Sequence, residues 1–225
     1  LDDFFWPYTT WFGRQEAARL PESLGKPAFL AAEASRFIQA HRDHPFLLYV
    51  NFLEPHMPFT GPRDSQYPPD AIPLPATFTH VLGPDQPLKA RLLREHYRRN
   101  GFGGQPLETE SDWRALIARY WGLCSLIDTH IGRILDTLDA CGLRDTTLVV
   151  FTSDHGDMMG AHRLLAKCVM FQEAVRVPLL VRLPGVIRPG PIPGPASQVD
   201  LLPTLLDFLD RPAPDSLQGK SLRPR

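Results

Sequence analysis

The fold is decided by residues 147–185, which read TLVVFTSDHGDMMGAHRLLAKCVMFQEAVRVPLLVRLPG. Residues 146–152 at its start are apolar and β-branched, a pattern typical of a buried strand. A polar loop follows at 153–160, and residues 177–183 (VPLLVRL) then repeat the strand pattern. The alternation of predicted strands and helices along the chain indicates an α/β layer fold. In open α/β sheets, ligands gather at the carboxyl ends of the strands.

A second strand end lies upstream. Residues 46–53 (FLLYVNFL) form a short, nearly continuous apolar run, which predicts a strand buried on both faces of a parallel sheet. A proline-rich loop follows at 54–75. The spacing of apolar residues predicts helices at 29–42, 87–99, 112–141, 168–175 and 200–209. Ser111 is the expected N-cap of the longest helix, and Gly142 is its expected stop.

Composition excludes several classes of protein. The 225 residues are 43% apolar and 22% charged, which is ordinary for a globular domain with a sizeable core. A net charge of −1 offers no basic field for nucleic acid. No run approaches the ~20 apolar residues that a membrane-spanning helix needs. The three cysteines, Cys124, Cys141 and Cys168, form no CxxC pair, so they fix no compartment.

Asp154 and His155 are the first candidates for chemistry, because they stand side by side at the end of the strand 146–152. A carboxylate oxygen and an imidazole nitrogen at a strand end can both reach a divalent cation, and Gly156 permits the tight turn that this needs. An Asp-His-Gly tripeptide is also compatible with a plain turn that carries a surface histidine.

Two further candidates, His56 and Lys167, suit an anionic ester. A histidine held between two prolines can bind an oxyanion or protonate a leaving alcohol. A lysine ammonium is a compact charge that suits an ester oxygen. Taken one at a time, each side chain is equally compatible with an ordinary surface position.

Together these segments resemble the sulfatase family, within the alkaline-phosphatase-like superfamily. The resemblance rests on 147–185, on Glu-Pro-His-Met-Pro at 54–58, on the helix around 127–132, and on the endings at 200–206 and 217–222. With His directly after Asp, the motif is most similar to choline-sulfatase-like and iduronate-sulfatase-like enzymes and to phosphonate monoester hydrolases. The resemblance implies a three-layer α/β/α fold with a mostly parallel sheet, incomplete here. Residues 1–225 would be a partial catalytic domain with a loop and helix insertion at 60–110 and a proline-rich end at 186–225.

The resemblance also implies roles for single residues. Asp154 and His155 match metal ligands, for calcium or, in some branches, manganese or magnesium. Lys167 matches the lysine that contacts sulfate oxygens, and His56 matches the histidine beside the ester oxygen, so both are expected to be catalytic and to bind substrate. His162 is expected on the substrate side. The substrate would be a sulfate ester of a small molecule or a saccharide.

The family's nucleophile has no counterpart in the printed sequence. It is a formylglycine made from Cys or Ser within Cys-x-Pro-Ser-Arg, and none of the three cysteines stands in such a motif. The family's early Asp-Asp metal pair is missing too, since no strand precedes Asp2 and Asp3, which we interpret as part of a loop. We therefore expect a C-terminal part of a longer domain that is inactive alone.

Three functions stay open at this level. The first is a sulfatase that needs the missing part, and the second is a phosphonate or phosphate ester hydrolase on the same scaffold, since both esters are anionic tetrahedral centres. The third is a non-catalytic binding module that kept the fold and lost the nucleophile. An in-frame Cys-x-Pro-Ser-Arg in the coding DNA upstream of Leu1 would argue against the third.

Overall fold

The computed structural model describes residues 20–103, 106–192 and 194–223, and these fall into two compact units. The first unit takes the chain up to Arg144 together with His155–Val177. The second takes Asp145–Asp154 and Pro178–Arg225. The two aspartates at the start of the chain, interpreted above as a loop, lie outside the described residues.

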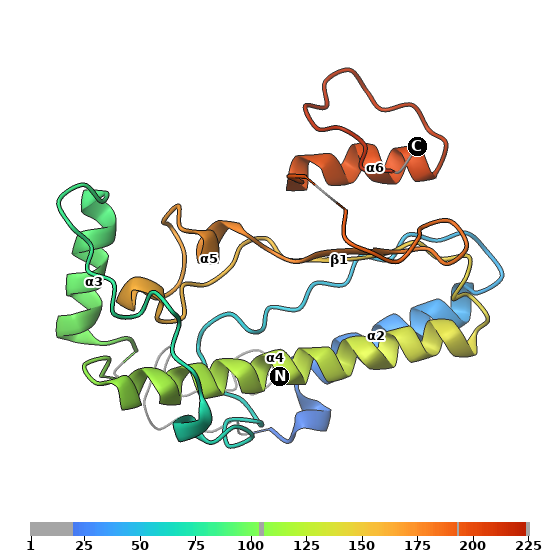
Figure 1. Ribbon diagram of the computed structural model, residues 1–225. Coiled ribbons are helices and arrows are strands. Elements are labelled where there is room, and N and C mark those ends of the chain that lie inside the picture. Colours follow the sequence, from blue (N-terminus) through green and yellow to red (C-terminus); the bar gives the residue numbers. More distant parts are fainter. Residues whose placement is uncertain (1–19, 104–105, 193, 224–225) are drawn as a thin grey trace. The chain divides into compact units, whose positions relative to one another are not determined.

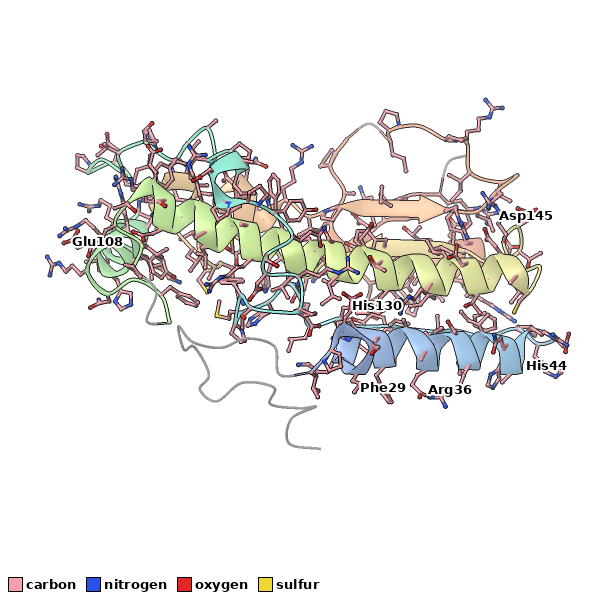
Figure 2. All side chains as sticks on the ribbon, turned by 90° about the horizontal axis from the view of Figure 1, so that it is seen from below. Phe29, Arg36, His44, Glu108, His130 and Asp145 are labelled. Atoms are coloured by element: carbon pink, nitrogen blue, oxygen red, sulfur yellow. The ribbon has the colours of Figure 1, made fainter. Side chains whose placement is uncertain are left out.

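Two helices form the frame of the first unit: α2 (Lys26–His41) lies along α4 (Glu110–Ala140) (Figure 1). Glu22, just before α2, lies 3.8 Å from His130, and further along Thr137 Oγ1 donates to the Ser35 hydroxyl at 2.9 Å, so the two helices run in the same direction. Figure 2 shows His130 on the side of α4 that faces α2. This histidine is completely buried, and burial lowers its pKa.

The long helix was predicted within two residues of its true bounds, but its expected cap was wrong. Thr109 is the N-cap, because its hydroxyl accepts from the Asp112 N–H while the Asp112 carboxylate accepts from the Thr109 N–H, a capping box. Ser111 lies inside the first turn. Gly142 follows the C-cap with φ of 72°, the left-handed conformation expected of it.

The core of the first unit lies against the N-terminal half of α4. Trp113 is 1% exposed, and its indole N–H donates to the Leu107 carbonyl at 3.2 Å. Around it pack the 3-10 turn η2 (Pro69–Ala71), α3 (Leu88–Asn100) and the loop that follows His155. Buried side chains of α3, of α4, of the loop that follows His155 and of residues 59–82 form one cluster: Phe59, Phe78, Leu82, Ala90, Tyr97, Leu116, Leu123, Leu126, Met158, Ala161, Leu164, Leu165 and Ala174. Residues 60–110, which are expected to form an insertion, thus contribute side chains to this core.

The loop after His155 contains two short helices. The 3-10 turn η3 (Ala161–Arg163) forms its tip, and α5 (Gln172–Val175) follows. The helix expected at 168–175 is therefore only its last four residues, because Cys168 has a φ of 77° that no helix accommodates.

The second unit is a two-stranded antiparallel ladder followed by a short helix. Strand β1 (Val149–Thr152) pairs with β2 (Leu179–Arg182), with Val149 opposite Arg182 and Thr152 opposite Leu179. The turn η4 (Gln198–Asp200) leads into α6 (Leu201–Phe208), where Pro203 is tolerated in the first turns. The Asp200 carboxylate accepts from the Lys220 N–H at 2.8 Å and holds the C-terminal segment to this turn.

Residues 46–53 differ from the expectation of a doubly buried strand. They belong to no helix or strand in the part of the chain that the structure describes. Exposure alternates along the segment, as in an extended chain, with Leu47 and Tyr49 each 85% exposed. Among the described residues, none of the helices combines the length and the apolar character that a membrane span requires.

Candidate functional site

His56 and Lys167, which are 111 residues apart in sequence, meet in the first unit: the Lys167 ammonium lies 2.8 Å from Nε2 of His56. The other ring nitrogen, Nδ1, lies 2.9 Å from the Met57 carbonyl oxygen. A carbonyl can only accept, so Nδ1 carries the proton and Nε2 carries the lone pair. Lys167 therefore donates to His56, and two of its three N–H groups remain for other acceptors.

The loop that presents Lys167 is held by Asp157. The Asp157 carboxylate accepts from the N–H groups of Met159 at 3.0 Å and Ala166 at 2.9 Å, so it bridges the two ends of the loop. Burial raises the pKa of Asp157, and these hydrogen bonds and the charges of Lys167 and His155 offset part of the rise. The carboxylate thus lies within electrostatic reach of two of the predicted site residues.

His155 has the same tautomer as His56. Its Nδ1 lies 2.8 Å from the Gly156 carbonyl oxygen, so Nδ1 donates and the lone pair is on Nε2. The backbone here is close-packed, because the Gly156 N–H donates to the Ala174 carbonyl at 2.9 Å and a Cβ at Gly156 would overlap the Glu173 carbonyl. Gly156 is therefore required by this close approach of two backbones.

Asp154 belongs to the second unit, at the end of β1. Its carbonyl and that of Ser153 both accept from the Gln198 side-chain amide at 2.7 Å, and the Ser153 hydroxyl donates to its carboxylate at 3.2 Å. The carboxylate is exposed. The end of β1 and the turn η4 thus hold the backbone of Asp154 in place, while its side chain stays accessible.

His162 lies at the tip of the loop, with a histidine that the sequence did not single out. Its Nδ1 lies 2.9 Å from Nδ1 of His80, and its ring stacks on Phe171 with centroids 4.3 Å apart. Burial lowers the pKa of His162, and the charge of His80 lowers it further. One ring of this pair donates and the other accepts. His162 as a substrate-side residue stays a prediction.

A divalent cation is only partly provided for by the described residues. Asp154 offers carboxylate oxygens and His155 offers the Nε2 lone pair, which are ligand types that such ions accept. A calcium ion takes six or more ligands. Within the described ranges, however, no group of three or more His, Cys, Asp and Glu side chains is placed to hold a metal. Asp154 belongs to the second unit and His155 to the first, and their joint role as metal ligands stays a prediction.

The family model described as "Sulfatase" matches residues 6–210, and the chain belongs to the sulfatase family. The multifunctional alkaline phosphatase superfamily protein PehA of Trinickia caryophylli is 32% identical over 220 residues, covering 92% of this chain and 42% of that protein. The ulvan-active sulfatase of Formosa agariphila is 30% identical over 205 residues, covering 87% of this chain and 35% of that protein. The chain thus spans less than half the length of these relatives.

Solved structures confirm the predicted fold class. The phosphonate monoester hydrolase of Silicibacter pomeroyi superposes with a TM-score of 0.80 at 26% identity, over 95% of this chain and 45% of that one. The phosphonate monoester hydrolase of Agrobacterium radiobacter gives a TM-score of 0.71 at 31% identity, over 92% of this chain and 43% of that one. The chain has an incomplete α/β fold of the alkaline-phosphatase-like type.

Proposed function

We propose that the protein to which this chain belongs is a hydrolase of anionic tetrahedral esters, with a sulfate monoester of a small molecule or a saccharide as substrate. The observation that carries the proposal is the hydrogen bond of 2.8 Å between Lys167 and His56. It joins a cation that can bind an ester oxygen to an imidazole that can handle a proton. Membership of the sulfatase family supports the same chemistry.

The two side chains divide the work. Lys167 binds a non-bridging oxygen of the ester with the N–H groups that His56 does not use, and so it stabilises negative charge as the bond to the leaving group breaks. His56 accepts a proton at Nε2 and passes it to the leaving alkoxide, because Nδ1 is committed to the Met57 carbonyl.

Two groups would complete the site. A divalent cation, held in part by Asp154 and His155, would neutralise charge on the ester and make its central atom more electrophilic. We propose calcium, with manganese or magnesium as the alternatives. A formylglycine from a part of the protein outside the printed sequence would supply the nucleophile.

The test is steady-state kinetics of the complete protein on 4-nitrophenyl sulfate. Lys167→Ala and His56→Ala are each expected to lower kcat/KM about a hundredfold or more, because each removes charge stabilisation or proton transfer. The double variant should be little worse than the poorer single variant, since the two side chains act as a unit. Lys89→Ala removes an exposed lysine from α3 and should leave kcat/KM unchanged. Full activity in both single variants would rule the proposal out.

A second candidate is hydrolysis of phosphonate monoesters, which the TM-score of 0.80 with a phosphonate monoester hydrolase favours. The same residues would serve it, because a phosphonate ester is also an anionic tetrahedral centre. Parallel kinetics on 4-nitrophenyl phenylphosphonate decide between the two. A kcat/KM that is higher for the phosphonate than for the sulfate would replace the sulfatase assignment.

A further inference from the structure

Three arginines gather where α3 packs against the tip of the loop that carries Lys167. Arg94 lies on α3, Arg163 lies in η3, and η3 contacts α3. Arg91 precedes Arg94 by three residues and so shares its helix face. Burial lowers the pKa of Arg94, and the charge of Arg163 lowers it further, so the two guanidinium groups lie close together. We call Arg91, Arg94 and Arg163 the arginine cluster.

Two donors of this cluster have no acceptor among the described residues. Nε of Arg91 and Nε of Arg163 are both buried, and neither has a hydrogen-bond partner among the described residues. In the same part of the chain, no carboxylate forms an ion pair with any guanidinium of the cluster. A buried cationic donor without an acceptor is costly, and a bound anion is one way in which proteins compensate it.

Other arginines on the same helix behave differently. Arg98 Nη2 donates to Glu95 at 2.7 Å and Arg99 Nε donates to Glu95 at 2.5 Å, and both side chains are more than 60% exposed. Their charge is already neutralised in part by a neighbour on the helix. The cluster thus differs from the other arginines of α3 because two of its donors have no acceptor. The number of basic residues on α3 does not by itself account for this difference.

An aromatic ring and a pair of histidines border the cluster. The Arg163 guanidinium lies 4.9 Å from the centroid of the Phe78 ring, which fixes its plane. The His80–His162 pair borders the cluster, and the charge of Arg94 acts on His162. The negative charge of Glu173 acts in the opposite direction and raises the pKa of His162. Planar guanidinium groups held in place in this way suit the oxygens of a sulfate or carboxylate.

The loop geometry sets the distance from the cluster to the ester. Its two arms pair through Met158 N–H to the Ala166 carbonyl at 2.8 Å and Gly160 N–H to the Leu164 carbonyl at 2.9 Å. Lys167 stands at the base of this ladder and Arg163 at its tip. Four residues of extended chain span at most ~13 Å. The cluster is thus within reach of a second group on a substrate whose ester lies at Lys167.

We propose that the arginine cluster is a second anion subsite, which binds a sulfate or carboxylate on the substrate at a distance from the ester under attack. This inference rests on the proposed function, because the subsite is defined by its distance from the ester site at His56 and Lys167. It narrows the substrate class to polyanionic esters, such as saccharides that carry more than one acidic group. A substrate with a single anionic group would occupy only one of the two sites.

Bis-sulfates of oligo(ethylene glycols) of increasing length test this as a molecular ruler, with the matching monosulfates as controls. Isothermal titration with the 225-residue chain should give a bis-sulfate of matching length a Kd about tenfold or more below that of its monosulfate, because the second contact is intramolecular. The ω-carboxylate analogues separate sulfate from carboxylate recognition. If no length binds more tightly than its monosulfate, the proposal is overturned.

Paired variants locate the effect. Arg94→Gln with Arg163→Gln should abolish the gain from the second sulfate, whereas Arg98→Gln with Arg99→Gln, the same charge change on exposed arginines, should preserve it. Arg94→Lys with Arg163→Lys should retain part of the gain if the fold is intact. An unchanged bis-sulfate Kd in the folded Gln pair would refute the subsite. Lys167→Ala separates the two proposals: if it leaves bis-sulfate binding intact while the Gln pair weakens it, the ester site fails and the anion site stands.

Discussion

His56 and His155 share one local device. In each, Nδ1 lies within 2.9 Å of the carbonyl oxygen of the next residue in the sequence. The carbonyl can only accept, so the proton is on Nδ1 and the lone pair is on Nε2. A ring fixed in this way can accept a proton or bind a cation through Nε2 without first changing its tautomer. The backbone carbonyl is thus what prepares each ring for its proposed role.

Asp157 carries a prediction at the same scale, because its carboxylate accepts from two backbone N–H groups across the loop. Asp157→Ala should lower the free energy of unfolding by about 2–3 kcal/mol, since it leaves buried donors without an acceptor. Asp157→Asn should cost less than 1 kcal/mol, roughly the worth of one neutral hydrogen bond, because an amide oxygen can accept both bonds and burial already disfavours the charge. Urea denaturation measures both values. Equal losses in the two variants would show that charge, and not acceptance, is what matters.

The pairing of His56 with Lys167 could be predicted only through the resemblance to sulfatases, because 111 residues separate them and no local pattern links the two. His80 was missed altogether. Nothing around Thr79 and Val81 marks it, and its contact with His162 is created by the packing of the insertion on the loop tip. Residue pairs that are made by tertiary packing leave no signal in spacing or composition.

Helix α4 shows what sequence periodicity can and cannot fix among the elements. Its apolar stripe predicted the helix within two residues at either end. The cap was misplaced because Thr109 and Ser111 are both good N-cap residues, and the choice depends on which hydroxyl the Asp112 carboxylate can reciprocate. Residues 168–175 were predicted as helical in full, since composition does not report the positive φ of Cys168.

Gly122 on α4 gives a prediction for the packing of an element. A Cβ there would overlap the carbonyl of Arg63, whose guanidinium donates to the Ser125 carbonyl at 2.7 Å and to both Glu22 carboxylate oxygens. Gly122→Ala should therefore destabilise the chain by about 1–3 kcal/mol despite the better helix propensity of alanine.

The matched control lies ten residues further along the same helix. Gly132 has nothing within 4 Å of the position that a Cβ would take. Gly132→Ala should therefore stabilise the chain by about 0.5–1 kcal/mol. Thermal and denaturant unfolding of both variants give the comparison. A stabilised Gly122→Ala would mean that the loop around Arg63 is free to move away from α4.

At the scale of the whole molecule, the segment 46–53 links the incomplete fold to the behaviour of the chain. A continuous apolar run predicts a strand covered on both faces, and the half-buried Phe46, Leu48, Val50 and Phe52 provide one such face. On the other face Leu47 and Tyr49 are each 85% exposed and Leu53 is 57% exposed. The apolar run predicts that both faces of the segment are buried. Among the described residues, no side chains cover the face of Leu47, Tyr49 and Leu53.

This exposed face should make the chain associate with itself. Exposed apolar side chains favour contact with another copy, and the backbone of an extended segment can form hydrogen bonds with another strand. Leu47→Thr with Tyr49→Thr should reduce self-association in sedimentation velocity at concentrations where the parent chain forms larger species. The free energy of unfolding should change by less than about 0.5 kcal/mol, since neither side chain is buried. Leu88→Gln with Leu92→Gln, on α3 where both residues are 60% exposed, is the control for a general loss of surface hydrophobicity. Equal effects of the two pairs would deny the segment any special part. An effect confined to Leu47 and Tyr49 would identify this face as the surface through which the chain associates with itself.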